Sequence, residues 1–390
     1  MIFDAAQDDI DVTIAALAAE FAETAAEYDR TAAFPFANIQ RLRDVGLQAL
    51  VVPREFGGRG LGLARAERVV NAVSRGEAST GLVLAQQYLF HGSLVRNPDF
   101  RDSLREMIFR TAVTEGAFVN NLRVEPDLGT PIRGGLPATV ARRTCDGWSL
   151  SGRKIYSTGV PVLAWNGVWA RTDEETPRVG VFVVPAGAQG FRIEETWRQL
   201  GMRASGSHDL ILDEVRIPFD HAAELKTLAE RAAPDATQMA WASALFSTIY
   251  DGAARAGRDW FVTFLRDRAP SNLGAPLSTL PRMQEALGEI DAALYANRIL
   301  LTNLSERVDR GQTPPAHESL YVKHNVSRNA LAAVSKALEL TGNPGLSQTN
   351  PLERHYRDVL CARVHSPQTD SIFLSGGRSA LVDAGVPTSA

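Results

Sequence analysis

Residues near the end of the chain have types and spacing suited to moving a proton. His365 and Ser366 stand directly before Pro367, and Asp370 follows Ser366 by four positions. An imidazole can donate a hydrogen bond or take a proton near neutral pH, whereas a serine hydroxyl needs a partner base before it can act. His365 is therefore the leading catalytic candidate, and Asp370 is the nearest acidic one. The alternative is that His365 only ends the last helix beside Pro367.

His91 is a second histidine with catalytic potential, in a predicted helix over 64–95 that is apolar around much of its surface. This helix, from Tyr88 to His91, is expected to line a substrate cavity together with Trp241 and Phe246. Such aromatic side chains favour an apolar or aromatic substrate. The alternative is that His91 and these aromatics are ordinary core residues, and the sequence leaves both interpretations open.

Length and composition limit the class of protein. A chain of 390 residues exceeds the usual size of one core, so two or three subdomains are expected. The net charge of −4 and the pI near 6.0 give no electrostatic reason to expect nucleic acid or an anionic membrane as a partner. Cys145 and Cys361 are too few for a metal cluster or a disulfide framework. The acidic start lacks the basic residues of a signal peptide, so a cytoplasmic location is expected.

The elements that must position these residues fall into three blocks. Residues 1–110 have helical periodicity and predict an N-terminal helical domain. Residues 111–225 contain short runs rich in valine, threonine and aromatics, with a turn signal at Asp146-Gly147, and predict a central antiparallel β-barrel. Residues 226–390 predict a C-terminal four-helix bundle. Its expected helices are 236–268, 280–309, 316–341 and 351–364. The fold class is thus α+β, mostly α.

Local motifs along the chain resemble those of the acyl-CoA dehydrogenase superfamily. They occur in the expected order, through helices, barrel and bundle, and cover nearly the whole chain. The motifs are Leu42-Arg-Asp-Val-Gly-Leu-Gln-Ala-Leu-Val-Val-Pro53 with Glu55-Phe-Gly-Gly58, Gly152-Arg-Lys-Ile-Tyr-Ser-Thr-Gly159, Trp197-Arg-Gln-Leu-Gly-Met-Arg-Ala-Ser-Gly-Ser-His-Asp209 with Val215-Arg-Ile-Pro218, and the stretch from Asn350 to Pro367.

The resemblance implies a flavin cofactor, but the expected catalytic glutamate is missing. In dehydrogenases of the superfamily a glutamate follows the aspartate of an Arg-Asp pair by eight positions; here the pair is Arg357-Asp358 and that position is Ser366. The other known position of the glutamate falls near Ala242, and residues 236–250 contain no acid. Removal of an α-proton from an acyl thioester needs a base. The sequence therefore argues against the standard dehydrogenase reaction.

The C-terminal stretch is more similar to the reduced-flavin monooxygenases of the superfamily, such as dibenzothiophene monooxygenase. Its marker is Arg354-His-Tyr-Arg-Asp358 followed by His365. That resemblance implies reduced FMN or FAD from a separate NAD(P)H:flavin reductase, and O2 activated as a C4a-hydroperoxide beside His365. No dinucleotide-binding fingerprint is present, since Gly57 to Gly62 has the wrong spacing. The family also implies a homotetramer with flavin shared between protomers.

The resemblance carries cofactor-binding expectations onto individual residues. The Thr158 hydroxyl would face flavin N5, and Tyr156, expected on the same strand face, would pack against the ring. Arg268 would reach the flavin phosphate across a subunit interface. The usual Thr-Glu-Pro-Gly loop is absent, because Val124-Glu-Pro-Asp127 matches it poorly. The remaining candidates are Asn121 at the ring edge, Ser207, Gln284, and the Gly342-Asn343 turn near the flavin tail, where a helix cap is the alternative.

Three functions are open at this point. The first is a two-component monooxygenase that uses reduced flavin and O2 on a small apolar, aromatic or sulfur-containing substrate; His365 and the missing glutamate favour it. The second is an acyl-CoA dehydrogenase or desaturase that uses FAD with a displaced base, for which Asp370 is the candidate. The third is a non-catalytic flavin-binding paralogue.

Overall fold

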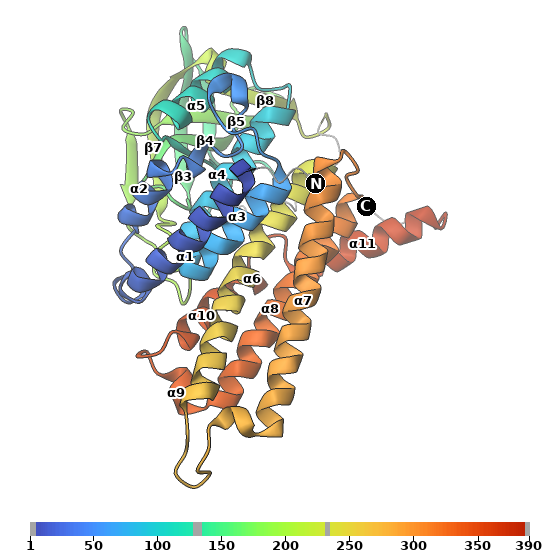
Figure 1. Cartoon of the computed structure of the whole chain (residues 1–390). Helices are drawn as coiled ribbons and strands as arrows, with labels where there is room; N and C mark the ends of the chain where they lie inside the picture. The colour runs from blue at the N-terminus through green and yellow to red at the C-terminus, as the bar shows by residue number, and fades with distance from the viewer. Residues whose placement is uncertain (1–4, 128–134, 231–234, 387–390) are drawn as a thin grey trace.

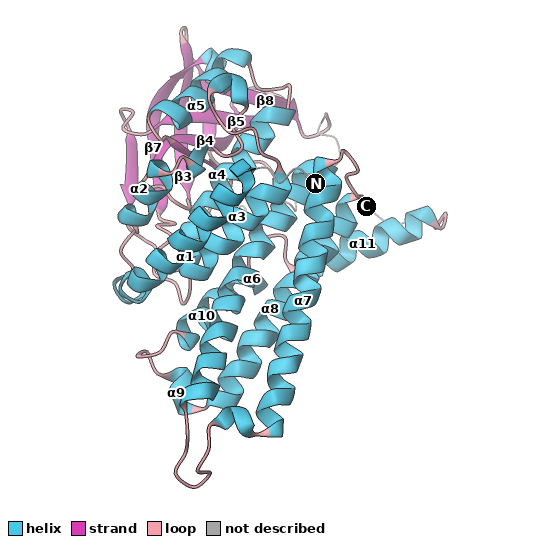
Figure 2. Ribbon diagram, viewed as in Figure 1, coloured by secondary structure: helices cyan, strands magenta, loops and turns pink. Residues whose placement is uncertain are grey.

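The computed structural model describes residues 5–127, 135–230 and 235–386. A sheet with surrounding helices occupies one end of the molecule, and a long helical bundle forms the other (Figures 1 and 2). The predicted fold class, α+β with mostly helix in three successive blocks, is confirmed. Among the described residues, no helix is long and apolar enough to cross a membrane.

Within the residues that the structure describes, the N-terminal block contains five α-helices. Glu77 separates the third from the fourth and starts the fourth by accepting the backbone N–H groups of Ser79 and Thr80 at 2.9 and 2.6 Å. The fourth helix is buried over most of its surface, in agreement with its apolar sequence. The five are α1 (Ala5–Thr31), α2 (Phe36–Asp44), α3 (Leu63–Gly76), α4 (Ala78–Arg96) and α5 (Asp102–Thr114).

The middle block forms one sheet, which has eight strands in the described part of the chain. Its strands are β1 (Phe118–Leu122), β2 (Val140–Arg143), β3 (Gly147–Lys154), β4 (Leu163–Thr172), β5 (Arg178–Pro185), β6 (Phe191–Glu194), β7 (Asp209–Pro218) and β8 (Ala222–Thr227). The order is β6-β7-β3-β2-β4-β5-β8, with β1 paired to β4.

The sheet is mixed, so the prediction of a purely antiparallel arrangement was wrong in this detail. Both β1 and β2 run parallel to β4. The physical reason is that intervening segments return the chain to the same end of the sheet before β4 begins, and such returns allow parallel pairing. The predicted turn at Asp146-Gly147 does join the antiparallel pair β2 and β3.

The C-terminal block forms the predicted bundle, with helix bounds close to those expected. Asp235 starts its first helix by accepting the backbone N–H groups of Thr237 and Gln238, and Pro281 begins the second, where its missing N–H costs nothing. A further helix, α11, projects away from the bundle (Figure 1). The helices are α6 (Ala236–Asp267), α7 (Pro281–Asp309), α8 (Ala316–Thr341), α9 (Asn343–Leu346), α10 (Leu352–Leu360) and α11 (Thr369–Asp383).

The Arg357-Asp358 pair joins the three blocks. Arg357 makes a two-pronged ion pair with Asp29 of α1 at 2.9 and 2.6 Å. The Asp358 carboxylate accepts the backbone N–H of Met202, which precedes β7, at 2.6 Å. A Cβ on Gly201 would lie 2.2 Å from the Arg357 carbonyl oxygen, so only glycine allows this approach. This junction fixes the loop before β7 against α10.

Candidate functional site

A group of buried polar side chains lies where β3 ends and β7 begins. The Thr158 Oγ1 and Ser207 Oγ atoms are 2.9 Å apart, and Ser205 Oγ is 2.8 Å from Ser207 Oγ. Asn120 of β1 donates its Nδ2 hydrogen to the Thr158 carbonyl oxygen at 3.0 Å. All four side chains are buried. These residues, named here the Thr158 cluster, bring the predicted Thr158 and Ser207 into contact.

Some buried polar atoms in this region have no hydrogen-bond partner among the described residues. Asn120 Oδ1, Asn121 Oδ1 and Ser157 Oγ are buried and have no partner among the described residues. Because buried polar atoms are nearly always paired, the oxygens of Asn120 and Ser157, which adjoin Thr158, could accept from a ligand's donors. Asn121 follows Asn120 on β1, so its side chain points to the other face of the strand, and its contact with a flavin stays a prediction. The edge of a flavin ring presents both N–H donors and carbonyl acceptors, which suit the oxygens of Asn120 and Ser157 and the hydroxyls of the Thr158 cluster. The residues present therefore fit a flavin.

Tyr156 and Thr158 do not share a strand face, so that prediction was wrong. Strand β3 ends at Lys154, and Tyr156 follows it with a left-handed φ of 56°. Tyr156 is 54% exposed, and its ring meets that of Trp197 edge-on with 6.0 Å between the ring centroids. The break in the strand cancels the two-residue alternation. Packing of Tyr156 against a flavin ring stays a prediction.

Glu125 belongs to the loop that matches the dehydrogenase pattern poorly. Its side chain is buried and bonded to residues of the sheet and the segment before it. Its carboxylate pairs with Lys154 Nζ at 2.5 Å and accepts the backbone N–H of Thr139 at 3.0 Å. Burial lowers the pKa of Lys154 to about 8. Glu125 thus takes no part in the candidate site, and the nearby contribution comes from Asn120.

His365 follows the 3-10 turn that extends α10 and contacts α6 through two aromatic residues. Its ring lies 4.4 Å from the Phe246 ring, with 33° between the planes. Its Nδ1 is 2.8 Å from the Tyr250 hydroxyl. Phe246 and Tyr250 are four positions apart on α6, so both reach the same imidazole. Burial, followed by the charge of Lys323, lowers the pKa of His365 to about 3, which makes the ring neutral at pH 7.

Lys323 of α8 fixes the backbone around His365. Its Nζ donates to the carbonyl oxygens of His365 at 2.8 Å and Pro367 at 2.9 Å. The lysine is 3% exposed and forms no ion pair within the described part of the chain. Burial lowers its pKa to about 8. The last helical turn and Pro367 are thereby held against α8.

Asp370 and His91 occupy different environments from His365. Asp370 lies in the first turn of α11 and is exposed. His91 is fully buried on α4, edge-on to Phe109 of α5 at 5.7 Å, and neither ring nitrogen has a hydrogen-bond partner among the described residues. Burial lowers the pKa of His91 to about 3. Tyr88, one turn earlier, is a core residue whose hydroxyl donates to the Leu47 carbonyl, so the interpretation of Tyr88 as a cavity residue was wrong.

The predicted phosphate and tail contacts lie at helix ends in the bundle. Arg268 ends α6 and is exposed, and Gln284 in the first turn of α7 donates to the Ser278 carbonyl at 2.9 Å. Gly342, with φ 62°, ends α8, and Asn343 begins α9. These ends gather at the extremity of the bundle remote from the sheet (Figure 1). One chain therefore presents them away from its own Thr158 cluster, and their role in binding flavin stays a prediction.

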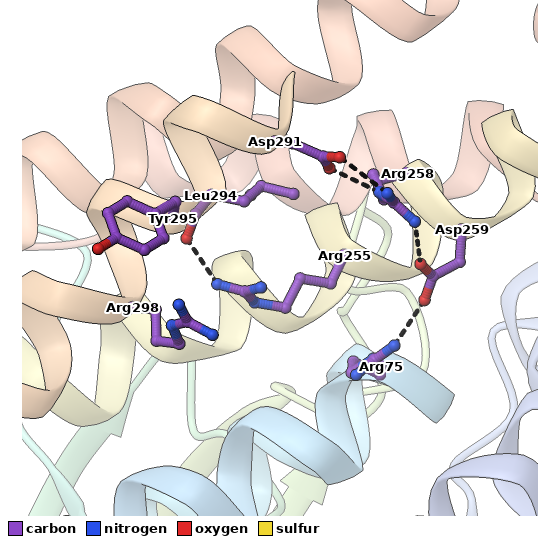
Figure 3. A pocket seen from close by; sticks show the side chains of 8 residues that line it. All are labelled: Arg75, Arg255, Arg258, Asp259, Asp291, Leu294, Tyr295 and Arg298. Atoms are coloured by element: carbon purple, nitrogen blue, oxygen red, sulfur yellow. Dashed lines mark hydrogen bonds and ion pairs between the residues drawn. The ribbon is translucent and has the colours of Figure 1, made fainter. Parts of the chain in front are cut away.

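An open cavity of about 300 Å³ lies between α3, α6 and α7 (Figure 3). Its charged groups are largely paired with one another: Arg258 binds Asp291 at 2.7 Å, and Arg75 binds Asp259 at 2.5 Å. It shares no residue with the Thr158 cluster or with the surroundings of His365. Its lining is Arg75, Arg255, Arg258, Asp259, Asp291, Leu294, Tyr295 and Arg298.

Tyr250 and Lys323 are the site residues that sequence reasoning missed. Tyr250 lies in an alanine-rich helix, where a tyrosine is typical of core packing, and its partner is 115 positions away. Lys323 occupies a helix position where an exposed lysine is the ordinary expectation. The available signal was the spacing of Phe246 and Tyr250, which places two aromatic side chains on one face of α6.

Comparison with known proteins identifies the same domain order. Profiles of the acyl-CoA dehydrogenase N-terminal, middle and C-terminal domains match residues 5–97, 124–215 and 235–366. The putative acyl-CoA dehydrogenase YdbM of Bacillus subtilis is 34% identical over 363 residues, which cover 93% of each chain.

Two solved structures are similar over almost their whole length. KijD3 in complex with dTDP is 30% identical, covers 95% of each chain and has a TM-score of 0.81; KijD3 is also known in complex with FMN and dTDP-3-amino-2,3,6-trideoxy-4-keto-3-methyl-D-glucose. The methanesulfinate monooxygenase MsuC of Pseudomonas fluorescens is 22% identical, with a TM-score of 0.84 over 100% of this chain and 99% of that one. At 22% identity, the comparison with MsuC shows a common fold and nothing about function.

Proposed function

This chain belongs to the acyl-CoA dehydrogenase family of flavin-dependent oxidoreductases, and from that premise we propose that it is a two-component monooxygenase. Its substrates would be a reduced FMN or FAD delivered by a separate NAD(P)H:flavin reductase, O2, and a small organic molecule. The observation that carries the proposal is the neutral His365, hydrogen-bonded to Tyr250, beside the position where a dehydrogenase needs its glutamate.

The Thr158 cluster would hold the flavin ring. Hydroxyls of Thr158 and Ser207 can donate to ring acceptors, while the free oxygen of Asn120 can accept from a ring N–H group. Bound reduced flavin supplies the electrons that activate O2. The protein's own part is to fix the ring, to exclude water, and to present His365 as a hydrogen-bonding group with its imidazole plane set by Phe246.

The missing base supports oxygenation over dehydrogenation. Ser366 takes the position of the usual glutamate, and the segment from Ala236 to Tyr250 contains no acid. A neutral imidazole with a pKa lowered by burial is a weak proton acceptor at pH 7. Such a ring serves better as a hydrogen-bond donor to an oxygen atom than as the base for a carbon acid.

The comparison with KijD3 also supports a function other than acyl-CoA dehydrogenation. KijD3 is 29% identical in the structure that contains FMN and an amino-keto sugar nucleotide. A nucleotide sugar therefore joins the apolar, aromatic and sulfur-containing compounds as a substrate class to test. A homotetramer, in which helix ends near Arg268 and Gln284 meet a neighbouring protomer's flavin, is part of this proposal.

A second candidate is an acyl-CoA dehydrogenase that uses FAD with Asp370 as its base. The specific observation in its favour is the 34% identity with the putative acyl-CoA dehydrogenase YdbM. Against it, Asp370 is exposed at the start of α11, where water would compete with substrate for the carboxylate.

One experiment separates the two functions. The purified protein is given anaerobically reduced FMN or FAD, then ¹⁸O2, and a panel of thioethers, indole and an amino-sugar nucleotide; products are read by mass spectrometry. In parallel, protein loaded with oxidised FAD is mixed anaerobically with butyryl-CoA and palmitoyl-CoA. Incorporation of ¹⁸O, reduced about 100-fold in His365→Ala, supports the monooxygenase. Flavin bleaching by an acyl-CoA that is lost in Asp370→Asn overturns it.

A further inference from the structure

The Tyr250 hydroxyl has one hydrogen-bond partner among the described residues, the Nδ1 atom of His365 at 2.8 Å. The phenol is buried, with 1% of its surface exposed, and burial raises the pKa of Tyr250 well above its ordinary value. Tyr250 therefore keeps its proton. A buried O–H needs an acceptor, and Nδ1 is the acceptor within reach, so the Tyr250 hydrogen must point at Nδ1.

The direction of that bond decides where the imidazole carries its own hydrogen. A neutral imidazole has one N–H and one lone-pair nitrogen. If Nδ1 accepts from Tyr250, the hydrogen lies on Nε2. The opposite tautomer would place two hydrogens between the same two atoms, or would turn the Tyr250 hydrogen toward a region without an acceptor. Neither arrangement is stable in a buried site.

Two further contacts hold the ring in this state. Phe246 packs against the imidazole face and fixes its plane. Lys323 anchors the His365 carbonyl and places a positive charge nearby, which opposes protonation of the ring. Within the described residues Nε2 has no partner, so its hydrogen is available to a bound molecule.

We propose that Tyr250 is a positioning residue that locks His365 in the Nε2–H tautomer, so that His365 acts as a fixed neutral hydrogen-bond donor and not as a general base. The acceptor would be an oxygen atom of the reacting group or of the substrate. This inference rests on the proposed function for its catalytic meaning, but the tautomer itself is a property of the free protein.

The surrounding ionisable groups come from each element packed against the ring. Lys323 belongs to α8 and Tyr250 to α6, while Asp358 and Cys361 belong to the segment that carries His365. Burial raises the pKa of Asp358 to about 7 and that of Cys361 to about 12. Because the raised pKa of Asp358 lies near the pH of the experiment, the differences between variants are what report on His365.

The test is ¹⁵N NMR of the imidazole nitrogens in protein labelled with [¹⁵N]histidine, without flavin. His365→Gln identifies the His365 signals. At pH 7 the wild type should show an unprotonated Nδ1 and a protonated Nε2, with no imidazolium down to about pH 5. Tyr250→Phe should give a mixture of tautomers and a pKa closer to the ordinary value. A protonated Nδ1 in the wild type, or an unchanged signal in Tyr250→Phe, would overturn the proposal.

Activity supplies the second readout. Tyr250→Phe keeps the ring volume, and its turnover in the ¹⁸O2 assay should fall about tenfold, with a new acidic limb in its pH profile. Tyr88→Phe, which removes another buried tyrosine hydroxyl outside the site, is the matched control and should keep wild-type turnover. If the tautomer is as proposed but no substrate is oxygenated, the proposed function fails and the positioning role stands. If substrate is oxygenated while His365 carries its hydrogen on Nδ1, the positioning role fails and the proposed function stands.

Discussion

The ammonium of Lys323 lies 2.8 Å from the carbonyl oxygen of His365, and it also binds the carbonyl oxygen of Pro367. A buried charge that is held by two backbone carbonyls is unusual, because most buried lysines pair with a carboxylate. This arrangement ties the backbone of the proposed donor to α8 independently of the Tyr250 contact.

Lys323→Met should therefore loosen the His365 segment. The two carbonyls lose charge-assisted hydrogen bonds, and we expect the free energy of unfolding to fall by about 2 kcal/mol. The pKa of His365 should rise, because the nearby positive charge is gone. Urea unfolding measures the first effect, and histidine NMR the second. Lys336→Met removes a partly exposed lysine from the same helix, paired with Glu289, and should cost under about 1 kcal/mol. Equal losses of stability in the two variants would contradict the role assigned to Lys323.

Glu67 should make stability depend on pH. It is buried on α3, where it accepts from the Thr248 hydroxyl at 2.5 Å. Burial, with a smaller contribution from Asp251, raises the pKa of Glu67 from 4.5 to about 7. Between these values the folded protein holds a proton that the unfolded chain lacks. The stabilisation is therefore present below about pH 4.5 and is lost as the pH rises through about 7.

Glu67→Gln tests this dependence, since glutamine can still accept from Thr248. We expect the fall in unfolding free energy between pH 5 and pH 8 to shrink by about 2.5 kcal/mol. The remaining fall should come from groups such as Asp358, which has a similar raised pKa. Glu106→Gln, at an exposed pair with Arg110, should leave the pH dependence unchanged. A Glu67→Gln curve parallel to that of the wild type would show that Glu67 is charged throughout.

Sequence periodicity predicted the bundle well because its helices are long and locally determined. The expected helices 236–268 and 316–341 correspond to Ala236–Asp267 and Ala316–Thr341, with an aspartate cap and a proline marking their starts. Strand direction was harder, since pairing of β1 and β2 with β4 depends on returns of the chain that no local pattern encodes.

The sequence could predict individual residues of the candidate site, but not which of them are in contact. Motif resemblance selected Thr158, Ser207 and His365, and the structure adds that the first two touch. It also adds Tyr250 and Lys323, whose contacts with the His365 segment span 115 and 42 positions. The failure at Tyr156 has a local cause: strand β3 ends at Lys154, and Tyr156 itself has a left-handed backbone conformation.

Asp251 should matter more for stability than any acid that lines the open cavity. It is 1% exposed and accepts hydrogen bonds from Arg255 at 2.6 Å, Asn71 at 2.9 Å and Asn297 at 3.0 Å. Asp251→Asn leaves Arg255 without its counter-charge, and the new amide N–H2 group faces the N–H donors of the neighbouring asparagines. We therefore expect the free energy of unfolding to fall by about 3 kcal/mol. Asp291→Asn, at a half-exposed pair, should cost under about 1 kcal/mol. Similar midpoints in urea for both variants would refute this ranking.

His91 should behave as a core residue. Its two unpartnered nitrogens are a cost that an apolar side chain would avoid. His91→Leu is expected to raise the unfolding free energy by about 1 kcal/mol and to leave oxygenation unchanged. Thermal unfolding and the ¹⁸O2 assay check both points. Loss of turnover in a stabilised variant would instead assign His91 to the substrate, as the sequence had allowed.

Thr158 should contribute directly to flavin affinity. Its hydroxyl is buried beside Ser207, and Asn120, which donates to the Thr158 carbonyl, keeps a free oxygen. Thr158→Val keeps the shape and removes the hydrogen bond, which is worth about 1 kcal/mol or roughly fivefold in Kd. Titration of FMN and FAD fluorescence quenching measures the change and also shows which flavin binds more tightly. The control is Ser305→Ala, which removes a buried hydroxyl bonded within α7. If Thr158→Val and Ser305→Ala bind flavin equally well, the ring does not lie against the Thr158 cluster.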